Sequence, residues 1–299
     1  MLHSTRFGII GSPVKGSMSP RLFTAAYSGR YPYDLIEEDD FETAWARFLA
    51  EYDGINITAP FKALAAAAAD IRSDEVVRIG AANLAVKTPG GVKVYNTDYE
   101  GVKRALLEVG DFATCRCHLP HTRASVSPEM PGRARDFSTS LEMTGRALEM
   151  TGRALIVGCG GAGRAAAAAA VDLGFEVTLA NRTPERALAM ASETALWKMR
   201  GKAVGPRVIG LGELRKAVRE ADLVIYNIPS GIPELEEIKR EDWEGRVVLE
   251  ANYKTPVLTD CGAKYISGKR WLLHQADAGY ELFTGEAPDF EAIKSALPF

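Results

Sequence analysis

The sequence predicts an α/β protein with two domains, each built from strands that alternate with helices. The chain of 299 residues has the length of about two domains. Short apolar runs of strand length are separated by amphipathic or alanine-rich segments of helix length. A glycine-rich turn at residues 158–163 follows one of these strands and marks the second domain as a Rossmann-type dinucleotide-binding domain.

Composition and charge narrow the choice of partners. The chain carries 36 basic and 39 acidic residues, and their interspersion argues against nucleic acid or a membrane surface and favours a small polar ligand. We find no apolar run of membrane-spanning length and no targeting leader, so we expect a cytoplasmic protein. The four cysteines do not make a disulfide framework, which agrees with a reducing compartment.

The first predicted elements are a buried strand at residues 7–10 and a helix that starts at Ser19 and the proline after it. Serine is a preferred N-cap and proline suits the first helical turn, so Ser19 is expected to cap this helix. Ser17 and Ser19 can also hold a carboxylate, because hydroxyls and free backbone N–H groups converge at a helix start. A strand at residues 33–37 and an amphipathic helix at residues 41–52 follow.

The strand-to-helix junction at residues 54–62 gathers three polar side chains. Alternating apolar residues predict a short strand that ends near Thr58, and an alanine-rich helix over residues 61–70 follows. Asn56, Thr58 and Lys62 are therefore expected to lie together at one end of this strand. A lysine in a first helical turn opposes the helix dipole, which makes Lys62 a candidate functional residue as well as an ordinary surface one.

A hairpin of strands at residues 81–87 and 92–95 leads into a helix over residues 99–109. Asp98 precedes this helix and is a natural N-cap. The junction can also bring Asp98 beside Lys62, and such a pair would form a dyad whose pKa values are shifted by their mutual charge.

The alternation of strands and helices breaks over residues 111–150, which contain a tandem L-E-M-T-G-R-A repeat. We interpret this segment as an irregular insertion in the second domain. Its C-x-C-H-x-x-H run differs in spacing from paired-knuckle zinc sites, so no metal is predicted. The residues of that run are Cys115, Cys117, His118 and His121.

The motif G-C-G-G-A-G at residues 158–163 lies between a strand at residues 154–157 and an alanine-rich helix at residues 164–173. Glycines let a pyrophosphate approach the backbone, and the positive end of the helix dipole meets its charge. The residues expected to bind the dinucleotide here are Gly158, Gly160, Gly161 and Ala162.

The next strand, at residues 176–180, ends in Asn181, Arg182 and Thr183, and Arg186 lies four residues beyond Arg182. A NAD site would present a carboxylate to the ribose hydroxyls at this strand end. Two guanidinium groups suit a 2′-phosphate instead, through charge-assisted hydrogen bonds. The predicted cofactor is therefore NADP(H); the alternative for the two arginines is a solvated helix start.

Further strands are predicted at residues 223–228 and 246–250, and a last helix over residues 270–283. His274 in this helix is interpreted as a packed or surface histidine rather than a catalytic base.

Seven motifs in this sequence resemble the shikimate dehydrogenase family in residues, order and spacing. The resemblance covers nearly the whole chain outside the insertion. The motifs are G-S-P-V-K-G-S-M-S-P from Gly11, G-I-N-I-T-A-P-F-K from Gly54, G-A-A-N from Gly80, N-T-D-Y-E-G from Asn96, G-C-G-G-A-G-R-A from Gly158, N-R-T from Asn181 and L-L-H-Q-A from Leu272.

This resemblance implies reversible, NADPH-dependent reduction of 3-dehydroshikimate to shikimate in chorismate and aromatic amino-acid biosynthesis. It implies that Lys62 and Asp98 are the catalytic pair. We interpret Lys62 as the immediate proton donor, oriented by Asp98, with a proton-transfer role shared by both residues as the alternative. It places Ser17, Ser19 and Tyr253 at the substrate carboxylate. The residues that it implies for the hydroxyl and carbonyl oxygens of the substrate are Asn56, Thr58, Asn83 and Gln275.

The resemblance also implies the division into domains. Residues 1–100 and 268–299 would form a substrate-binding and catalytic domain, to which the C-terminal helix returns, and residues 101–267 an NADP-binding Rossmann domain. The oligomeric state is left open, with a homodimer as one candidate.

Gly16, Leu84 and Tyr226 depart from the family's pattern and bear on substrate or cofactor preference. Two alternatives therefore remain: a quinate or related cyclic polyol-acid dehydrogenase, and a non-catalytic NADP-binding relative. A methylene-tetrahydrofolate dehydrogenase shares the architecture, but the serine pair and the N-T-D stretch suit a small polyol acid better.

Overall fold

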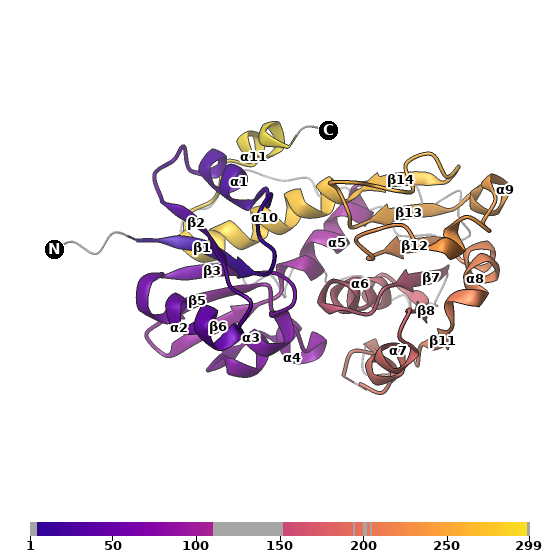
Figure 1. Cartoon of the computed structure of the whole chain (residues 1–299), viewed down its shortest axis with the longest axis horizontal. Helices are drawn as coiled ribbons and strands as arrows, with labels where there is room; N and C mark the ends of the chain where they lie inside the picture. The colour runs from indigo at the N-terminus through magenta and orange to yellow at the C-terminus, as the bar shows by residue number, and fades with distance from the viewer. Residues whose placement is uncertain (1–4, 110–151, 194, 200–201, 204, 298–299) are drawn as a thin grey trace, which may run out of the picture.

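The computed structural model describes residues 5–109, 152–193, 195–199, 202–203 and 205–297. Within this part of the chain, two six-stranded sheets lie beside each other, and helices cover both faces of each (Figure 1). This arrangement confirms the predicted α/β fold with two domains. The predicted insertion, with its candidate metal ligands, lies outside the described residues.

The first sheet has the strand order β2-β1-β3-β5-β6-β4, in which β1 is parallel to β2 and β3 while β5 is antiparallel to β3 and β6. Its strands are β1 (Phe7–Gly11), β2 (Tyr33–Glu37), β3 (Gly54–Ile57), β4 (Ile71–Arg72), β5 (Leu84–Thr88) and β6 (Gly91–Tyr95). Apolar residues of α2 (Phe41–Glu51), α3 (Lys62–Ala68) and α4 (Asp74–Ile79) are buried on one face. The other face is covered by α1 (Ser19–Ala26), α10 (Gly268–Thr284) and α11 (Phe290–Ala296).

The second sheet is parallel throughout and has the order β11-β8-β7-β12-β13-β14. This is the strand order of a doubly wound Rossmann sheet, which places a ligand where the winding reverses, between β7 and β12. The strands are β7 (Gly152–Val157), β8 (Phe175–Ala180), β11 (Arg207–Ile209), β12 (Leu223–Tyr226), β13 (Val247–Glu250) and β14 (Lys264–Ser267). Helices α6 (Gly161–Asp172) and α7 (Pro184–Ala191) cover one face, and α8 (Leu214–Glu220) and α9 (Arg240–Trp243) the other.

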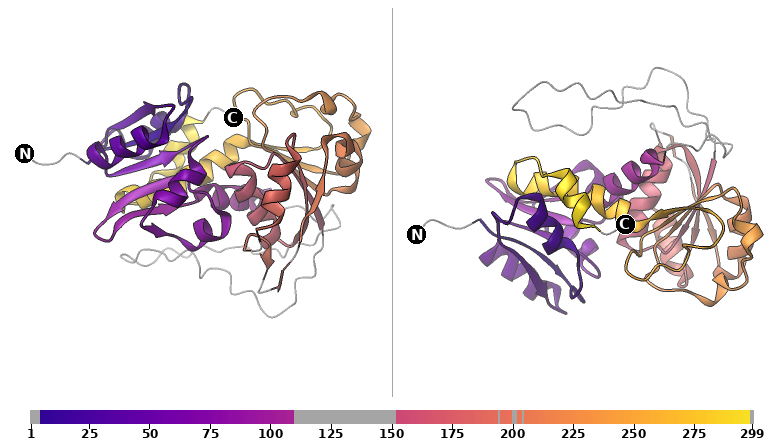
Figure 2. Two further views of the ribbon diagram at one scale, coloured as in Figure 1. Left: turned by 60° about the horizontal axis from the view of Figure 1, so that its bottom comes forward. Right: turned by 90° about the horizontal axis from the view of Figure 1, so that it is seen from above.

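Helices α5 (Thr97–Glu108) and α10 form the junction between the two sheets (Figure 2). Helix α5 packs along α10 on one side and against α6 on the other. Gly101 allows the close approach of α5 and α10, because a Cβ at that position would lie 2.7 Å from the backbone oxygen of Trp271. Helix α5 therefore couples the first sheet to the helix that follows the glycine-rich turn.

Charged side chains reinforce this junction. Arg164 in the first turn of α6 donates to both carboxylate oxygens of Glu193 at 2.5 Å and to the carbonyl oxygen of Ile79 at 3.1 Å. Arg78 of α4 donates to Asp172 at the end of α6 at 2.7 Å. Both arginines thus connect α4 to α6, and Arg164 also connects α6 to Glu193 after α7.

The start of α5 differs from the prediction in a way that matters for the site. The helix begins at Thr97, and its N-cap is Asn96, whose side-chain oxygen accepts a hydrogen bond from the Tyr99 backbone N–H at 3.3 Å. Asp98 lies inside the first turn and does not cap the helix. Its carboxylate is therefore available for a contact with another element.

Ser19 is likewise not an N-cap, contrary to the prediction. Helix α1 begins at Ser19 itself, after Met18, and no side-chain hydrogen bond caps it. The Ser19 hydroxyl instead lies 3.2 Å from the Ser17 hydroxyl. The other predicted elements are confirmed, most of them with shifted ends. Several elements were not predicted because they are short or lack a clear period, among them β4, α4, α7, β11, α8, α9, β14 and α11.

The α5–α10 contact leads to a stability prediction. Gly101→Ala should lower the free energy of unfolding by about 1–3 kcal/mol, because a methyl group in a filled helix contact forces the helices apart. Gly210→Ala is the matched control, since a Cβ there would meet nothing within 4 Å. Urea denaturation measures both, and equal stabilities would contradict the packing described for α5 and α10.

Candidate active site

An ion pair between Lys62 and Asp98 lies at the centre of the site. The Lys62 ammonium donates a hydrogen bond to a carboxylate oxygen of Asp98. The two side chains are only 16% and 5% exposed, although they are separated by more than thirty positions in the chain. Each charge is thereby compensated by the other, which a largely buried charge requires.

Local structure fixes both members of this pair at helix starts. Lys62 is the first residue of α3, and its carbonyl oxygen accepts a hydrogen bond from the Ala82 backbone N–H at 2.8 Å. Buried Asn83 holds the start of α5: its side-chain oxygen accepts from the Thr97 backbone N–H at 2.7 Å, and its amide donates to the Thr97 hydroxyl at 3.1 Å. Residues 82 and 83 therefore set the position of both Lys62 and Asp98.

The buried Asn56 side chain connects this pair to residues 16–19 at the start of α1, which we call the serine loop. Its amide donates to the Asn83 carbonyl oxygen at 3.4 Å, and its side-chain oxygen accepts from the Tyr33 hydroxyl at 2.6 Å. Tyr33 is also hydrogen-bonded to the Ser19 side chain, and burial raises the pKa of Tyr33. Tyr33 was not among the predicted site residues, because nothing in its strand pattern distinguishes it from a core tyrosine.

The structure brings Ser17, Ser19 and Tyr253 together. The Ser17 hydroxyl accepts from the Ser19 backbone N–H at 3.3 Å and lies 3.2 Å from the Ser19 hydroxyl. Tyr253, which follows β13, forms a hydrogen bond with the backbone of Met18 between them. Burial raises the pKa of Tyr253, and its hydroxyl is protonated at neutral pH. Three hydroxyl groups from two domains therefore converge on one loop.

Thr58 and Gln275 border the same region through packing. The Thr58 methyl group lies against Gly11, where a Cβ would come within 2.3 Å of it. Gln275 lies on α10, and its Cβ is 3.0 Å from the Cβ position of Gly101, one turn after Asp98. For neither side chain does the described chain provide a hydrogen-bond partner, which leaves their polar groups available to a ligand.

The glycine-rich turn lies directly against Lys62. A Cβ at Gly161, the first residue of α6, would lie 3.0 Å from Lys62 Cδ. A Cβ at Gly163 would lie only 1.9 Å from the Gly158 carbonyl oxygen, and Gly158 has a φ of 98° that favours glycine. The turn at the end of β7 therefore leaves space beside the α6 start and touches the ion pair.

The glycine-rich turn has the features that a dinucleotide pyrophosphate requires. Gly160 precedes the N-terminus of α6 with nothing within 4 Å of its Cβ position, and Ala162 lies in the first helical turn. Asn227, after β12, lies 3.3 Å from the Cβ position of Gly158, and its buried side-chain oxygen has no partner in the described chain. Open space, helix N–H groups and an unpaired buried acceptor together fit a cofactor at the reversal point of the sheet.

Of the residues after β8, Asn181 is held by hydrogen bonds, whereas Arg182 and Arg186 are exposed. The Asn181 side-chain oxygen accepts from the Cys159 N–H at 3.1 Å, and its amide donates to the Thr183 carbonyl oxygen at 2.8 Å. Asn181 thus ties the end of β8 to the glycine-rich turn. Arg182 and Arg186 are exposed and make no hydrogen bond or ion pair with any residue the structure describes, so both guanidinium groups are available to an anion.

The three positions that depart from the family pattern have structural explanations. Leu84 is buried under α10, 3.0 Å from the Cβ position of Gly279. Tyr226 is buried, and its hydroxyl donates to the Ser230 carbonyl oxygen at 2.7 Å, which stabilises the loop after β12. Gly16 has a φ of 78° in the serine loop, a conformation that favours glycine.

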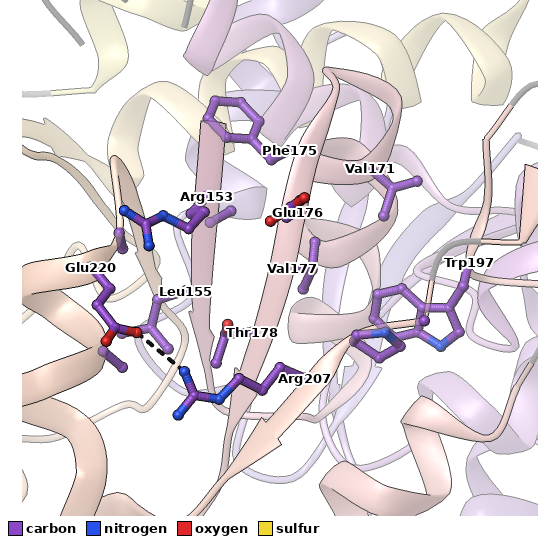
Figure 3. Close-up of a pocket in the computed structure, with 15 residues that line it drawn as sticks. Arg153, Leu155, Val171, Phe175, Glu176, Val177, Thr178, Trp197, Arg207 and Glu220 are labelled. Atoms are coloured by element: carbon purple, nitrogen blue, oxygen red, sulfur yellow. Dashed lines mark hydrogen bonds and ion pairs between the residues drawn. The ribbon is translucent and has the colours of Figure 1, made fainter. Parts of the chain in front are cut away.

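A separate cavity of about 420 Å³ lies at the opposite end of the second sheet (Figure 3). Its lining includes Arg153 and Phe175, which lie at the starts of β7 and β8, and Arg207, which donates to Glu220 at 3.1 Å. None of the predicted site residues lines it. Ligands of parallel α/β sheets bind at the carboxyl ends of the strands, so we do not place the site in this cavity.

The described residues contain no group of three or more histidine, cysteine or acidic side chains arranged to hold a metal ion. Among their helices, none combines the length and apolar character needed to cross a membrane.

Comparisons with known proteins identify the family of this chain. Residues 9–85 match the family described as the shikimate dehydrogenase substrate binding domain, and residues 136–231 match the alanine dehydrogenase/PNT C-terminal domain. The shikimate dehydrogenase (NADP(+)) of Halobacterium salinarum is 31% identical over 307 residues, which cover 97% of each chain.

Solved structures show the same fold. The shikimate 5-dehydrogenase of Thermus thermophilus, solved with NADP(H) and shikimate, has a TM-score of 0.69 and 28% identity, covering 98% of this chain and 100% of that one. The quinate dehydrogenase of Corynebacterium glutamicum, solved with NAD, has a TM-score of 0.72 at 22% identity, covering 98% of each chain, and indicates the fold alone. Because the Halobacterium salinarum enzyme is 31% identical to this chain over 97% of each sequence, this chain belongs to the shikimate dehydrogenase family.

Proposed function

We propose that this protein is an NADP-dependent shikimate dehydrogenase, which interconverts 3-dehydroshikimate and shikimate in chorismate and aromatic amino-acid biosynthesis. The observation that carries the proposal is the Lys62–Asp98 pair packed against Gly161 of the glycine-rich turn. A proton donor and a dinucleotide site meet there, which is the requirement for reducing a ketone by hydride. The curated NADP-dependent relative and the relative solved with NADP(H) and shikimate support the choice of cofactor and substrate.

In this proposal, NADPH supplies a hydride to the ketone carbon of 3-dehydroshikimate. The Lys62 ammonium transfers a proton to the ketone oxygen, so that the ketone gains one hydride and one proton and becomes an alcohol. Asp98 orients the ammonium and compensates its charge before transfer. In the reverse direction, neutral Lys62 accepts the proton from the shikimate hydroxyl.

The other predicted site residues bind and orient the substrate and the cofactor. Ser17, Ser19 and Tyr253 hold the substrate carboxylate through the hydroxyl groups that converge beside Met18. The residues that contact the hydroxyl and carbonyl oxygens of the substrate are Asn56, Thr58, Asn83 and Gln275. The residues that bind the cofactor are Gly158, Gly160, Gly161, Ala162, Asn181, Arg182, Thr183 and Arg186.

The domains divide these tasks. Residues 1–100 with 268–299 bind the substrate and carry the catalytic pair, and residues 101–267 bind NADP(H). Because Tyr253 approaches Met18 from the second domain, both domains contribute to substrate binding. A cytoplasmic location and a homodimer stay predictions of the sequence.

The substrate choice is tested by turnover. Purified protein mixed with NADP and shikimate should reduce the cofactor, which the absorbance of reduced nicotinamide reports. Quinate in place of shikimate distinguishes the alternative substrate, since the overall fold is shared with a quinate dehydrogenase. Oxidation of quinate but not of shikimate would replace the proposed substrate, and cofactor binding without turnover of either would favour a non-catalytic relative.

The catalytic pair is tested by two substitutions. Lys62→Ala should lower kcat by about a hundredfold to ten-thousandfold, the usual contribution of a positioned proton donor. Asp98→Asn should also lower kcat, because it removes the charge that holds the ammonium. NADP affinity, measured by fluorescence titration, should stay near that of the parent.

Lys294→Ala on the exposed side of α11 serves as the control for loss of a lysine. Circular dichroism establishes that each variant is folded. If folded Lys62→Ala keeps the parental kcat, Lys62 is not the proton donor.

The cofactor choice is tested at the two free arginines. The double variant Arg182→Gln/Arg186→Gln should weaken NADP binding by about tenfold to a hundredfold, because it removes two charge-assisted contacts to the 2′-phosphate. NAD lacks this phosphate, so its affinity for the double variant is the internal control. Equal affinity of the parent protein for NAD and NADP would contradict the prediction that these arginines bind the 2′-phosphate.

A further inference from the structure

A lysine in the loop after β13 reaches the serine loop of the other domain. A Cβ built on Gly16 would lie 3.6 Å from Lys254 Nζ. Gly16 directly precedes Ser17, and Lys254 directly follows Tyr253. The ammonium therefore lies beside the loop on which the hydroxyl groups of Ser17, Ser19 and Tyr253 converge.

The loop that carries Lys254 is fixed at both ends by hydrogen bonds. Fully buried Glu250 accepts from the backbone N–H groups of Val257 at 2.8 Å and Leu258 at 3.1 Å. The Asn252 side-chain oxygen accepts from the Lys254 N–H at 3.2 Å, and its amide donates to the Thr255 carbonyl oxygen at 2.7 Å. The backbone position of Lys254 thus follows from a structured turn.

The Lys254 ammonium has no charged partner among the described residues. Lys254 is exposed, and its ammonium forms no ion pair or hydrogen bond with the residues the structure describes. Two carboxylates that contact the residues before Gly16 have other partners: Glu37 accepts from the backbone N–H groups of Val14 and Lys15 at 3.1 Å, and Asp39 accepts from the Ser12 hydroxyl at 2.5 Å. The ammonium is therefore available to an external anion.

The hydroxyl groups around Met18 are neutral donors, so they leave the charge of a bound carboxylate uncompensated. A cation at hydrogen-bond range supplies that charge and makes a stronger contact than a neutral donor does. The positive φ of Gly16 favours a residue without a side chain, and the ammonium lies at van der Waals distance from the Cβ position of this glycine. We propose that Lys254 is a specificity-determining residue that binds the substrate carboxylate as its counter-ion.

This inference rests on the proposed function for the identity of the acid. It adds a charged contact from the second domain to the hydroxyl contacts of the first. Carboxylic acids should therefore be preferred over uncharged analogues of the same ring, and the preference should depend on Lys254.

Calorimetry of the NADP-loaded protein tests the contact, with shikimate and its uncharged methyl ester as the two ligands. Lys254→Met should weaken shikimate binding by about tenfold, while ester binding stays within about twofold of the parent. Lys254→Arg keeps the charge and should retain most of the shikimate affinity. In steady-state kinetics, Lys254→Met should raise the KM for shikimate and leave kcat within about twofold.

Lys216→Met is the control, because it removes an exposed lysine of α8 in the same domain. Equal loss of acid and ester binding in Lys254→Met, or no loss of either, would overturn the inference. Parent protein that does not oxidise shikimate would refute the proposed function separately. Parent protein that binds shikimate no better than the ester would refute the role of Lys254 whether or not turnover occurs.

Discussion

The ion pair between Lys62 and Asp98 constrains the rest of the fold. Removing two charges from water is unfavourable unless they compensate each other at close range, so the starts of α3 and α5 must meet. Asn83 and Asn96 then fix the first turn of α5 by side-chain hydrogen bonds. Since α5 packs on α10 and on α6, the position of one carboxylate is linked to the arrangement of both sheets.

The two members of the pair differ in how well they suit their positions. A carboxylate in a first helical turn interacts favourably with the helix dipole, whereas an ammonium in the same position is repelled. Asp98 therefore fits α5, while Lys62 lies at the start of α3 against the local preference and is held there by its partner. Positions at which a residue opposes the preference of its own helix are commonly functional. Lys62 is such a position, and its side chain also lies against Gly161 of the glycine-rich turn.

Sequence patterns were sufficient for the fold class and for the sets of residues at the strand ends, because apolar periodicity and the glycine motif are local signals. Sequence patterns did not predict which residue caps the start of α1 or of α5. Asp98 and Ser19 both have the chemistry of an N-cap, and only the competing side chain of Asn96 and the backbone around Met18 decide otherwise. Tyr33 could not be predicted as a site residue, because its hydroxyl becomes relevant only when β2 places it beside Asn56.

The positive charges around the candidate site are distributed so that the two anions of the proposed function would bind apart from each other. Arg182 and Arg186 are exposed after β8. The glycine-rich turn at the end of β7 carries no charged side chain of its own before Arg164. Lys254 lies beside the serine loop. Arg164 is itself compensated by Glu193, so it does not compete for an anion. The Lys62 ammonium is compensated by Asp98 in the same way. Under the proposed function, a cofactor phosphate would bind to Arg182 and Arg186 and a substrate carboxylate to Lys254, none of which has a carboxylate partner among the described residues. Lys62, the proposed proton donor, is kept from binding either anion by Asp98.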